Sequence, residues 1–131
     1  MTLPAKKENG DLNGVHILVV DDSDDLREIL EFILKSKGAD VDSARDGAEA
    51  INKANAIPYD IILMDMRMPG LDGNDTAMKI RSTLAKIKII ALTGDVDGEK
   101  FLRKDSPFNA YVVKPIDPAN LSVTILKTID A

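Results

Sequence analysis

The sequence contains no cysteine, which excludes disulfide bonds, thiolate chemistry and cysteine-ligated zinc sites. It also contains no apolar run long enough to cross a bilayer, and residues 1–14 lack the apolar core of a signal peptide. We therefore expect a cytoplasmic location without insertion into a membrane.

Clusters of lysine and arginine are missing as well. The 17 basic residues are outnumbered by 22 acidic ones, which gives a formal net charge of -5 and leaves no basic surface for a phosphate backbone. Direct binding to nucleic acid is therefore not expected. The 131 residues and the 44% hydrophobic content are typical of one globular domain. We place this domain at residues 15–131, after a polar lead-in or linker at 1–14.

Strand and helix patterns alternate along the domain. Short apolar or alternating runs predict strands at 15–20, 39–44, 60–65, 87–92 and 110–113. Helical spacing and capping residues predict a first helix capped by Ser23 or a neighbouring aspartate, and helices after Asp46 and Asp117. They also predict a helix over 74–84 and a short helix near 97–104. The expected apolar face of the first helix consists of Leu26, Ile29, Leu30, Ile33 and Leu34. Five such units with right-handed crossovers predict a doubly wound (βα)5 flavodoxin-like α/β fold, with parallel strands in the order 2-1-3-4-5.

Acidic side chains stand where two of these strands end. Asp65 closes the third strand, and Asp21 and Asp22 follow the first strand directly. The predicted strand order makes these two strands neighbours, so the three carboxylates meet at one edge of the sheet. Two like charges about 4 Å apart repel by roughly 4 kcal/mol at an effective dielectric constant near 20, which calls for a compensating cation. Oxygen ligands without histidine or cysteine favour Mg²⁺.

Two further polar residues, Thr93 and Lys114, end the fourth and fifth strands at the same edge. Together these strand ends closely resemble the receiver domains of two-component response regulators, over about residues 15–129. The resemblance is carried by four motifs in the correct order. They are Leu-Val-Val-Asp21-Asp22, Leu-Met-Asp65-Met-Arg-Met-Pro-Gly, Ile-Ala-Leu-Thr93-Gly and Tyr111-Val-Val-Lys114-Pro115.

By this resemblance, Asp65 is the nucleophile that takes a phosphoryl group from the phosphohistidine of a histidine kinase or histidine phosphotransfer protein. Asp21, Asp22, Asp65 and the backbone carbonyl of Arg67 would bind Mg²⁺, which offsets the negative charge of the transferring group. The expected role is that of a phosphoacceptor signalling domain in a phosphorelay. It would catalyse its own phosphorylation and slow dephosphorylation without being a turnover enzyme.

The resemblance also assigns roles to the other side chains of the predicted site. Thr93 and Lys114 would contact the phosphoryl group, and Thr93 and Tyr111 would reorient to switch a surface that an unknown downstream protein reads. Tyr111 has a simpler interpretation as a packing residue. Arg67 and Asp95 stand two places beyond the acceptor and the switch threonine, and they are expected to tune the lifetime of the phosphoryl group.

One segment departs from the family pattern, since residues 104–109 replace the usual Gly-Ala turn and shorten the region of the fourth helix. Lys114-Pro115 resembles the cis peptide bond of the family. A lone histidine, His16, is interpreted as a structural residue.

Three alternatives stay open. A Mg²⁺-dependent phosphohydrolase of the haloacid dehalogenase type also uses a strand-end aspartate, but it needs a second aspartate at the position of Arg67. A receiver-like module that binds partners without phosphorylation is the second alternative. The third concerns context, because a stand-alone regulator and a receiver from a hybrid histidine kinase fit the sequence equally.

Overall fold

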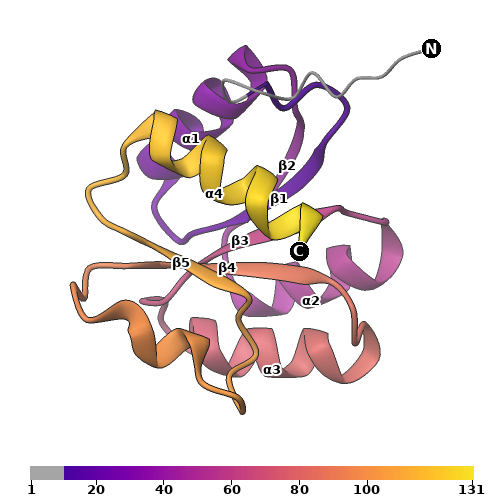
Figure 1. Cartoon of the computed structure of the whole chain (residues 1–131). Coiled ribbons are helices and arrows are strands. Elements are labelled where there is room, and N and C mark those ends of the chain that lie inside the picture. Colours follow the sequence, from indigo (N-terminus) through magenta and orange to yellow (C-terminus); the bar gives the residue numbers. More distant parts are fainter. Residues whose placement is uncertain (1–10) are drawn as a thin grey trace.

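All five predicted strands are present in the computed structural model, which describes residues 11–131. They are β1 His16–Val20, β2 Asp40–Ala44, β3 Ile61–Asp65, β4 Lys88–Thr93 and β5 Ala110–Val113. The strands pair in parallel in the order β2-β1-β3-β4-β5, which confirms the predicted topology (Figure 1). Every residue of β3 is buried, as expected for a central strand that helices cover on both faces.

The helices begin at polar capping residues. They are α1 Asp24–Ser36, α2 Gly47–Ala56, α3 Gly73–Thr83 and α4 Pro118–Asp130. Ser23, Asp46 and Asp117 accept hydrogen bonds from backbone N–H groups of the first turns of α1, α2 and α4, so these three predicted caps are confirmed. The cap of α3 is Asp72, and this helix begins one residue before the predicted range.

The two helical layers enclose separate halves of the core. α1 and α4 cover one face of the sheet, and α2 and α3 cover the other (Figure 1). Leu30 and Leu34 of α1 are buried as predicted, whereas Ile29 is 54% exposed. The apolar pattern of α1 is therefore wider than the strip that contacts the sheet, because the margins of an apolar stripe lie at the limits of the contact.

The fourth strand–helix unit differs from the others. The predicted short helix at 97–104 is a 3-10 helix, η2, at Gly98–Leu102, and residues 103–109 run without helix or strand to β5. Arg81 of α3 holds this irregular segment from the side. It donates to the carbonyl oxygen of Pro107 at 2.6 Å and to Asn109 Oδ1 at 3.0 Å. No helix among residues 11–131 is long and apolar enough to span a membrane.

Contacts tie both ends of the described chain to the same edge of the sheet. The Leu12 side chain is fully buried, and its N–H donates to the carbonyl oxygen of Lys37 at 2.9 Å, so packing begins within the range expected as a lead-in. Lys88, the first residue of β4, donates through Nζ to the carbonyl oxygen of Ala131 at 3.1 Å.

His16 also lies at this edge, at the start of β1. Its Nε2 is 3.3 Å from Asp42 Oδ2, and the Tyr59 hydroxyl donates to the same oxygen at 2.8 Å. The rings of His16 and Tyr59 lie 4.7 Å apart. Because Asp21 follows the opposite end of β1, His16 is remote from the strand-end aspartates. Its contacts with Asp42 and Tyr59 agree with the interpretation of His16 as a structural residue.

Candidate functional site

The three strand-end aspartates meet, as predicted. Carboxylate oxygens of Asp21, Asp22 and Asp65 all lie within 4.8 Å of one another. Asp21 is 1% exposed and Asp65 is 3% exposed, whereas Asp22 lies at the surface. Two of the three negative charges are therefore held in a poorly solvated position, where their mutual repulsion is stronger than in water.

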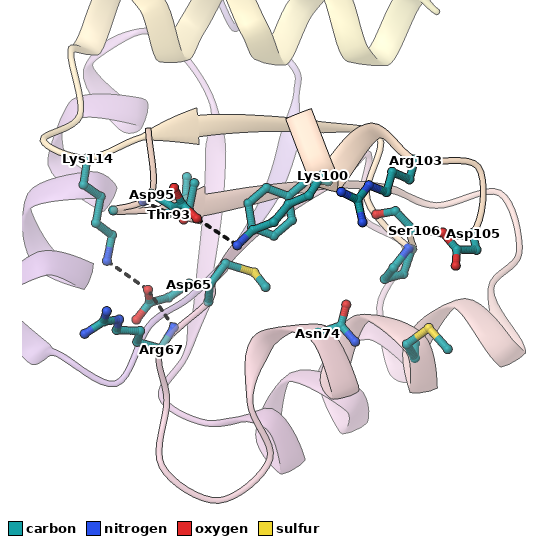
Figure 2. A pocket seen from close by; sticks show the side chains of 16 residues that line it. Asp65, Arg67, Asn74, Thr93, Asp95, Lys100, Arg103, Asp105, Ser106 and Lys114 are labelled. Atoms are coloured by element: carbon teal, nitrogen blue, oxygen red, sulfur yellow. Dashed lines mark hydrogen bonds and ion pairs between the residues drawn. The ribbon is translucent and has the colours of Figure 1, made fainter. Parts of the chain in front are cut away.

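Lys114 is the cation that lies against the three aspartates (Figure 2). Its Nζ donates to Asp65 Oδ1 at 2.9 Å, and the N–H of Arg67 donates to the same oxygen at 3.3 Å. The N–H of Lys114 itself donates to the carbonyl oxygen of Thr93 at 2.7 Å, which joins the ends of β4 and β5. The Lys114–Pro115 peptide bond is cis, as the resemblance implied.

Asp21 is the most crowded of the acids. Burial raises the pKa of its carboxyl group above the ordinary value, the hydrogen bond from the N–H of Ser23 opposes this shift, and the charge of Asp65 adds to it. Within residues 11–131, Asp21 Oδ2 is buried and receives no hydrogen bond. A buried, unpartnered carboxylate oxygen beside two further carboxylates fits a hard divalent cation, and the absence of nitrogen and sulfur ligands from this cluster favours Mg²⁺.

We expect Asp21→Asn to stabilise the Mg²⁺-free protein at pH 7 by about 1 kcal/mol. A raised carboxyl pKa means that the folded state binds the proton more tightly, so stability falls as pH rises from 3.8 through the raised pKa. The neutral amide removes this penalty and keeps an oxygen for the N–H of Ser23. Urea denaturation at pH 7 and near pH 3.5 measures the difference, which should shrink at the lower pH. An equal loss of stability at both pH values would contradict the expectation.

Thr93 and Tyr111, the two residues predicted to switch, lie on the neighbouring strands β4 and β5. The Thr93 side chain is buried, and its Oγ1 accepts a hydrogen bond from the N–H of Asp95 at 3.0 Å. Tyr111 is partly buried, with its ring 6.3 Å from that of Phe101 in η2. Tyr111 therefore packs against η2 in this structure, while its predicted part in switching stays a prediction.

A groove of about 1090 Å³ runs from this cluster past η2. Asp65, Thr93 and Lys114 lie at one end, and Asp105 and Ser106 lie toward the other, with α3 forming the opposite wall (Figure 2). The groove runs along the segment between β4 and β5, where the sequence predicted a short helix and the structure has η2. The shortened helix thus leaves the site open on one side.

Sequence reasoning missed a side chain of this groove, Lys100. Its Nζ donates to Asp95 Oδ2 at 2.8 Å. A spacing of five residues does not match the three- and four-residue spacings at which side chains pair on an α-helix, so the sequence pattern contains no signal for this ion pair.

Comparison with known proteins agrees with this geometry. The profile of the response regulator receiver domain matches residues 17–126. The chain is 33% identical over 110 residues to the alkaline phosphatase synthesis transcriptional regulatory protein PhoP of Bacillus subtilis, which covers 83% of this chain and 46% of that protein. It is 36% identical over 120 residues to hybrid signal transduction histidine kinase L of Dictyostelium discoideum. This alignment covers 85% of this chain and 7% of that protein. The chain belongs to the response regulator receiver family, and it spans less than half the length of either relative.

Solved structures show the same fold. The receiver domain of sensor histidine kinase PA1611 from Pseudomonas aeruginosa has a TM-score of 0.81 and 33% identity, covering 90% of this chain and 99% of that one. That domain carries a magnesium ion coordinated in its active-site cleft. Chemotaxis protein CheY4 of Vibrio cholerae has a TM-score of 0.81 and 29% identity, and the superposition covers 87% of this chain and 98% of that one.

Proposed function

We propose that this receiver domain accepts a phosphoryl group on Asp65 from the phosphohistidine of a histidine kinase or a histidine phosphotransfer protein. The observation that supports this most strongly is the buried Asp65 carboxylate, which Lys114 holds through Oδ1 beside two further acids. The relatives contribute the donor class, because one of them is a hybrid histidine kinase.

The chemistry follows from how Asp65 is held. Lys114 and the N–H of Arg67 fix Oδ1, while Oδ2 receives no hydrogen bond from the described residues and is the oxygen available to attack. A new O–P bond forms, the P–N bond of the phosphohistidine breaks, and the imidazole keeps the electron pair of that bond and takes a proton. Lys114 lies where negative charge accumulates on the transferring group, and so it stabilises the transition state.

The acidic cluster has a role as a metal site in this proposal. Asp21, Asp22, Asp65 and the backbone carbonyl of Arg67 would hold Mg²⁺. The bound ion would offset the charge of the carboxylates and of the phosphoryl oxygens. Asp21 prepares such a site by presenting a buried oxygen without a hydrogen-bond donor among residues 11–131.

The remaining side chains are proposed to respond to the phosphoryl group. The Thr93 hydroxyl keeps its proton available for a phosphoryl oxygen, since its oxygen is the acceptor in the bond from Asp95. Thr93 and Tyr111 would change position together and alter a surface that a downstream protein reads. Arg67 and Asp95 are exposed at the mouth of the groove, where they would influence how water reaches the acyl phosphate.

Family membership favours this proposal over a haloacid dehalogenase type of hydrolase, for which Arg67 replaces a required aspartate. The relatives include both transcriptional regulators and a hybrid kinase. The proposed downstream partner is a protein.

Intact-mass spectrometry after incubation with acetyl phosphate, with Mg²⁺ or with a chelator, tests the proposal. We expect one phosphoryl adduct that requires Mg²⁺ and disappears after treatment with alkali. Borohydride reduction followed by peptide sequencing should locate it as homoserine at position 65. Absence of an adduct with acetyl phosphate and with a phosphohistidine donor would favour the non-phosphorylated interaction module.

A further inference from the structure

An ion pair between Asp95 and Lys100 links the two ends of the segment that follows β4, next to the acidic site. Asp95 Oδ1 accepts a hydrogen bond from the N–H of Asp97 at 2.9 Å, and Oδ2 accepts one from Lys100 Nζ at 2.8 Å. The N–H of Asp95 donates to Thr93 Oγ1 at 3.0 Å. Lys100 therefore connects η2 to the side chain of Asp95, and the backbone of Asp95 is in turn bonded to the Thr93 side chain.

This ion pair is easily exchanged. The side chain of Lys100 is 47% exposed and that of Asp95 is 44% exposed, and exposed pairs of this kind stabilise a protein only slightly. Lys100 also lines the same groove as Asp65 (Figure 2). Its ammonium group ends a flexible four-carbon chain with three donors, so it can turn to a stronger anion in the groove.

Phosphorylation creates such an anion. Before transfer, a bound divalent cation together with Lys114 would balance the charges of the three aspartates. An aspartyl phosphate has close to two negative charges where the carboxylate had one, so the site gains about one negative charge. One more cation from the groove restores the balance.

We propose that Lys100 is this cation: its ammonium group leaves Asp95 for a phosphoryl oxygen on Asp65, and η2 thereby loses its ion pair with the segment after β4. The inference rests on the proposed function of Asp65. It makes Lys100 a phosphoryl-binding side chain in addition to Lys114.

The packing of η2 explains why this exchange has a structural effect. A Cβ atom at Gly98 would lie 2.2 Å from the Tyr111 ring, so the backbone of η2 rests directly on that ring. Phe101 adds an edge contact with Phe108 at 5.5 Å between ring centroids. Once Lys100 has left Asp95, the aromatic contacts and the hydrogen bond from the N–H of Asp97 to Asp95 Oδ1 remain. Movement of Tyr111 would then shift η2 together with its exposed side chain Leu102.

Two other cations line the groove, and Arg103 serves as the control. Arg67 and Arg103 are both exposed, and neither has an ion-pair partner among residues 11–131. Arg67 can approach the phosphoryl group without breaking a contact of η2. Arg103 follows η2 and makes no hydrogen bond or ion pair with Asp95. A charge effect without a specific role for Lys100 would appear with Arg103 as well.

The test uses the full chain with Mg²⁺, before and after treatment with acetyl phosphate, with the extent of phosphorylation read from the intact mass. NMR of labelled lysine follows the Lys100 side chain, with Lys127 of α4 as the reference. Hydrogen exchange follows the amides of residues 96–102. We expect the Lys100 signal to shift on phosphorylation and exchange in η2 to rise roughly two- to fivefold.

Substitutions of Lys100 distinguish its proposed exchange of partners from a role in packing alone. In Lys100→Gln, exchange in η2 should already be fast without phosphorylation and rise no further with it. Lys100→Arg should restore most of the coupling, while Arg103→Gln should behave as the wild type in η2. If the adduct forms but neither the Lys100 signal nor η2 exchange changes, the inference is overturned and the phosphoacceptor function stands. If no adduct forms, both are overturned.

Discussion

Asp65→Asn is expected to abolish the phosphoryl adduct completely. The amide has the shape of the carboxylate and can still accept hydrogen bonds from Lys114 and from the N–H of Arg67 through its oxygen. It has no anionic oxygen to attack phosphorus, because its second polar atom is an NH₂ group. The fold should therefore persist while the chemistry is lost. Intact-mass spectrometry with acetyl phosphate and Mg²⁺ compares the variant with the wild type.

Asp25→Asn is the matched control for this substitution. Asp25 is an exposed acid in the first turn of α1, and its replacement removes one negative charge from the same side of the sheet. We expect it to be phosphorylated as the wild type is. An adduct of equal yield in Asp65→Asn would show that another residue is the acceptor. Circular dichroism on each variant establishes that a loss of the adduct does not come from unfolding.

Arg81→Met is expected to destabilise the fold by about 2–4 kcal/mol. The guanidinium group donates to the carbonyl oxygens of Ala85, Ile87 and Pro107 and to Asn109 Oδ1. Hydrogen bonds from charged donors contribute about 1.5–3 kcal/mol each, and part of this is recovered because water can reach some of the acceptors. Methionine keeps the apolar stem and removes the donors. Urea denaturation measures the loss.

Two variants define the reason for the Arg81 effect. Arg81→Lys keeps the charge but cannot direct donors at four acceptors at once, so it should recover less than half of the loss. Arg45→Met removes an arginine that is 75% exposed and that, among residues 11–131, forms an ion pair only with Glu49, so a change below about 0.5 kcal/mol is expected. Similar losses for Arg81→Met and Arg45→Met would mean that the clamp on residues 107–109 is unimportant.

Arg81 also illustrates where sequence reasoning stops. The strands, their order and the convergence of Asp21, Asp65 and Lys114 followed from apolar runs that end in polar residues. These features depend on local pattern and on parallel topology. A single arginine in an amphipathic helix looks the same whether it points to water or clamps a distant loop. Its partners Pro107 and Asn109 lie more than twenty residues away in sequence and are set by tertiary structure alone.

The region after β4 was predictable in outline only. The departure of residues 104–109 from the family pattern indicated a short fourth helix, and the structure has η2 at Gly98–Leu102. Its 3-10 form was not predicted, because periodicity over so few residues does not distinguish helix types. The contact of Gly98 with the Tyr111 ring depends on how η2 lies on the sheet, and no sequence pattern encodes that placement.

The anchoring of Leu12 and Ala131 determines how an attached protein could communicate with Asp65. Both lie at the edge where the strands begin, through bonds to Lys37 and Lys88, whereas Asp65 lies where the strands end. A five-residue strand separates the two edges by roughly 17 Å. A module tethered at either position therefore starts on the far side of the domain from the proposed phosphorylation site. Unless its linker wraps around the domain, it senses the phosphoryl group through movements of the helices and not through direct contact.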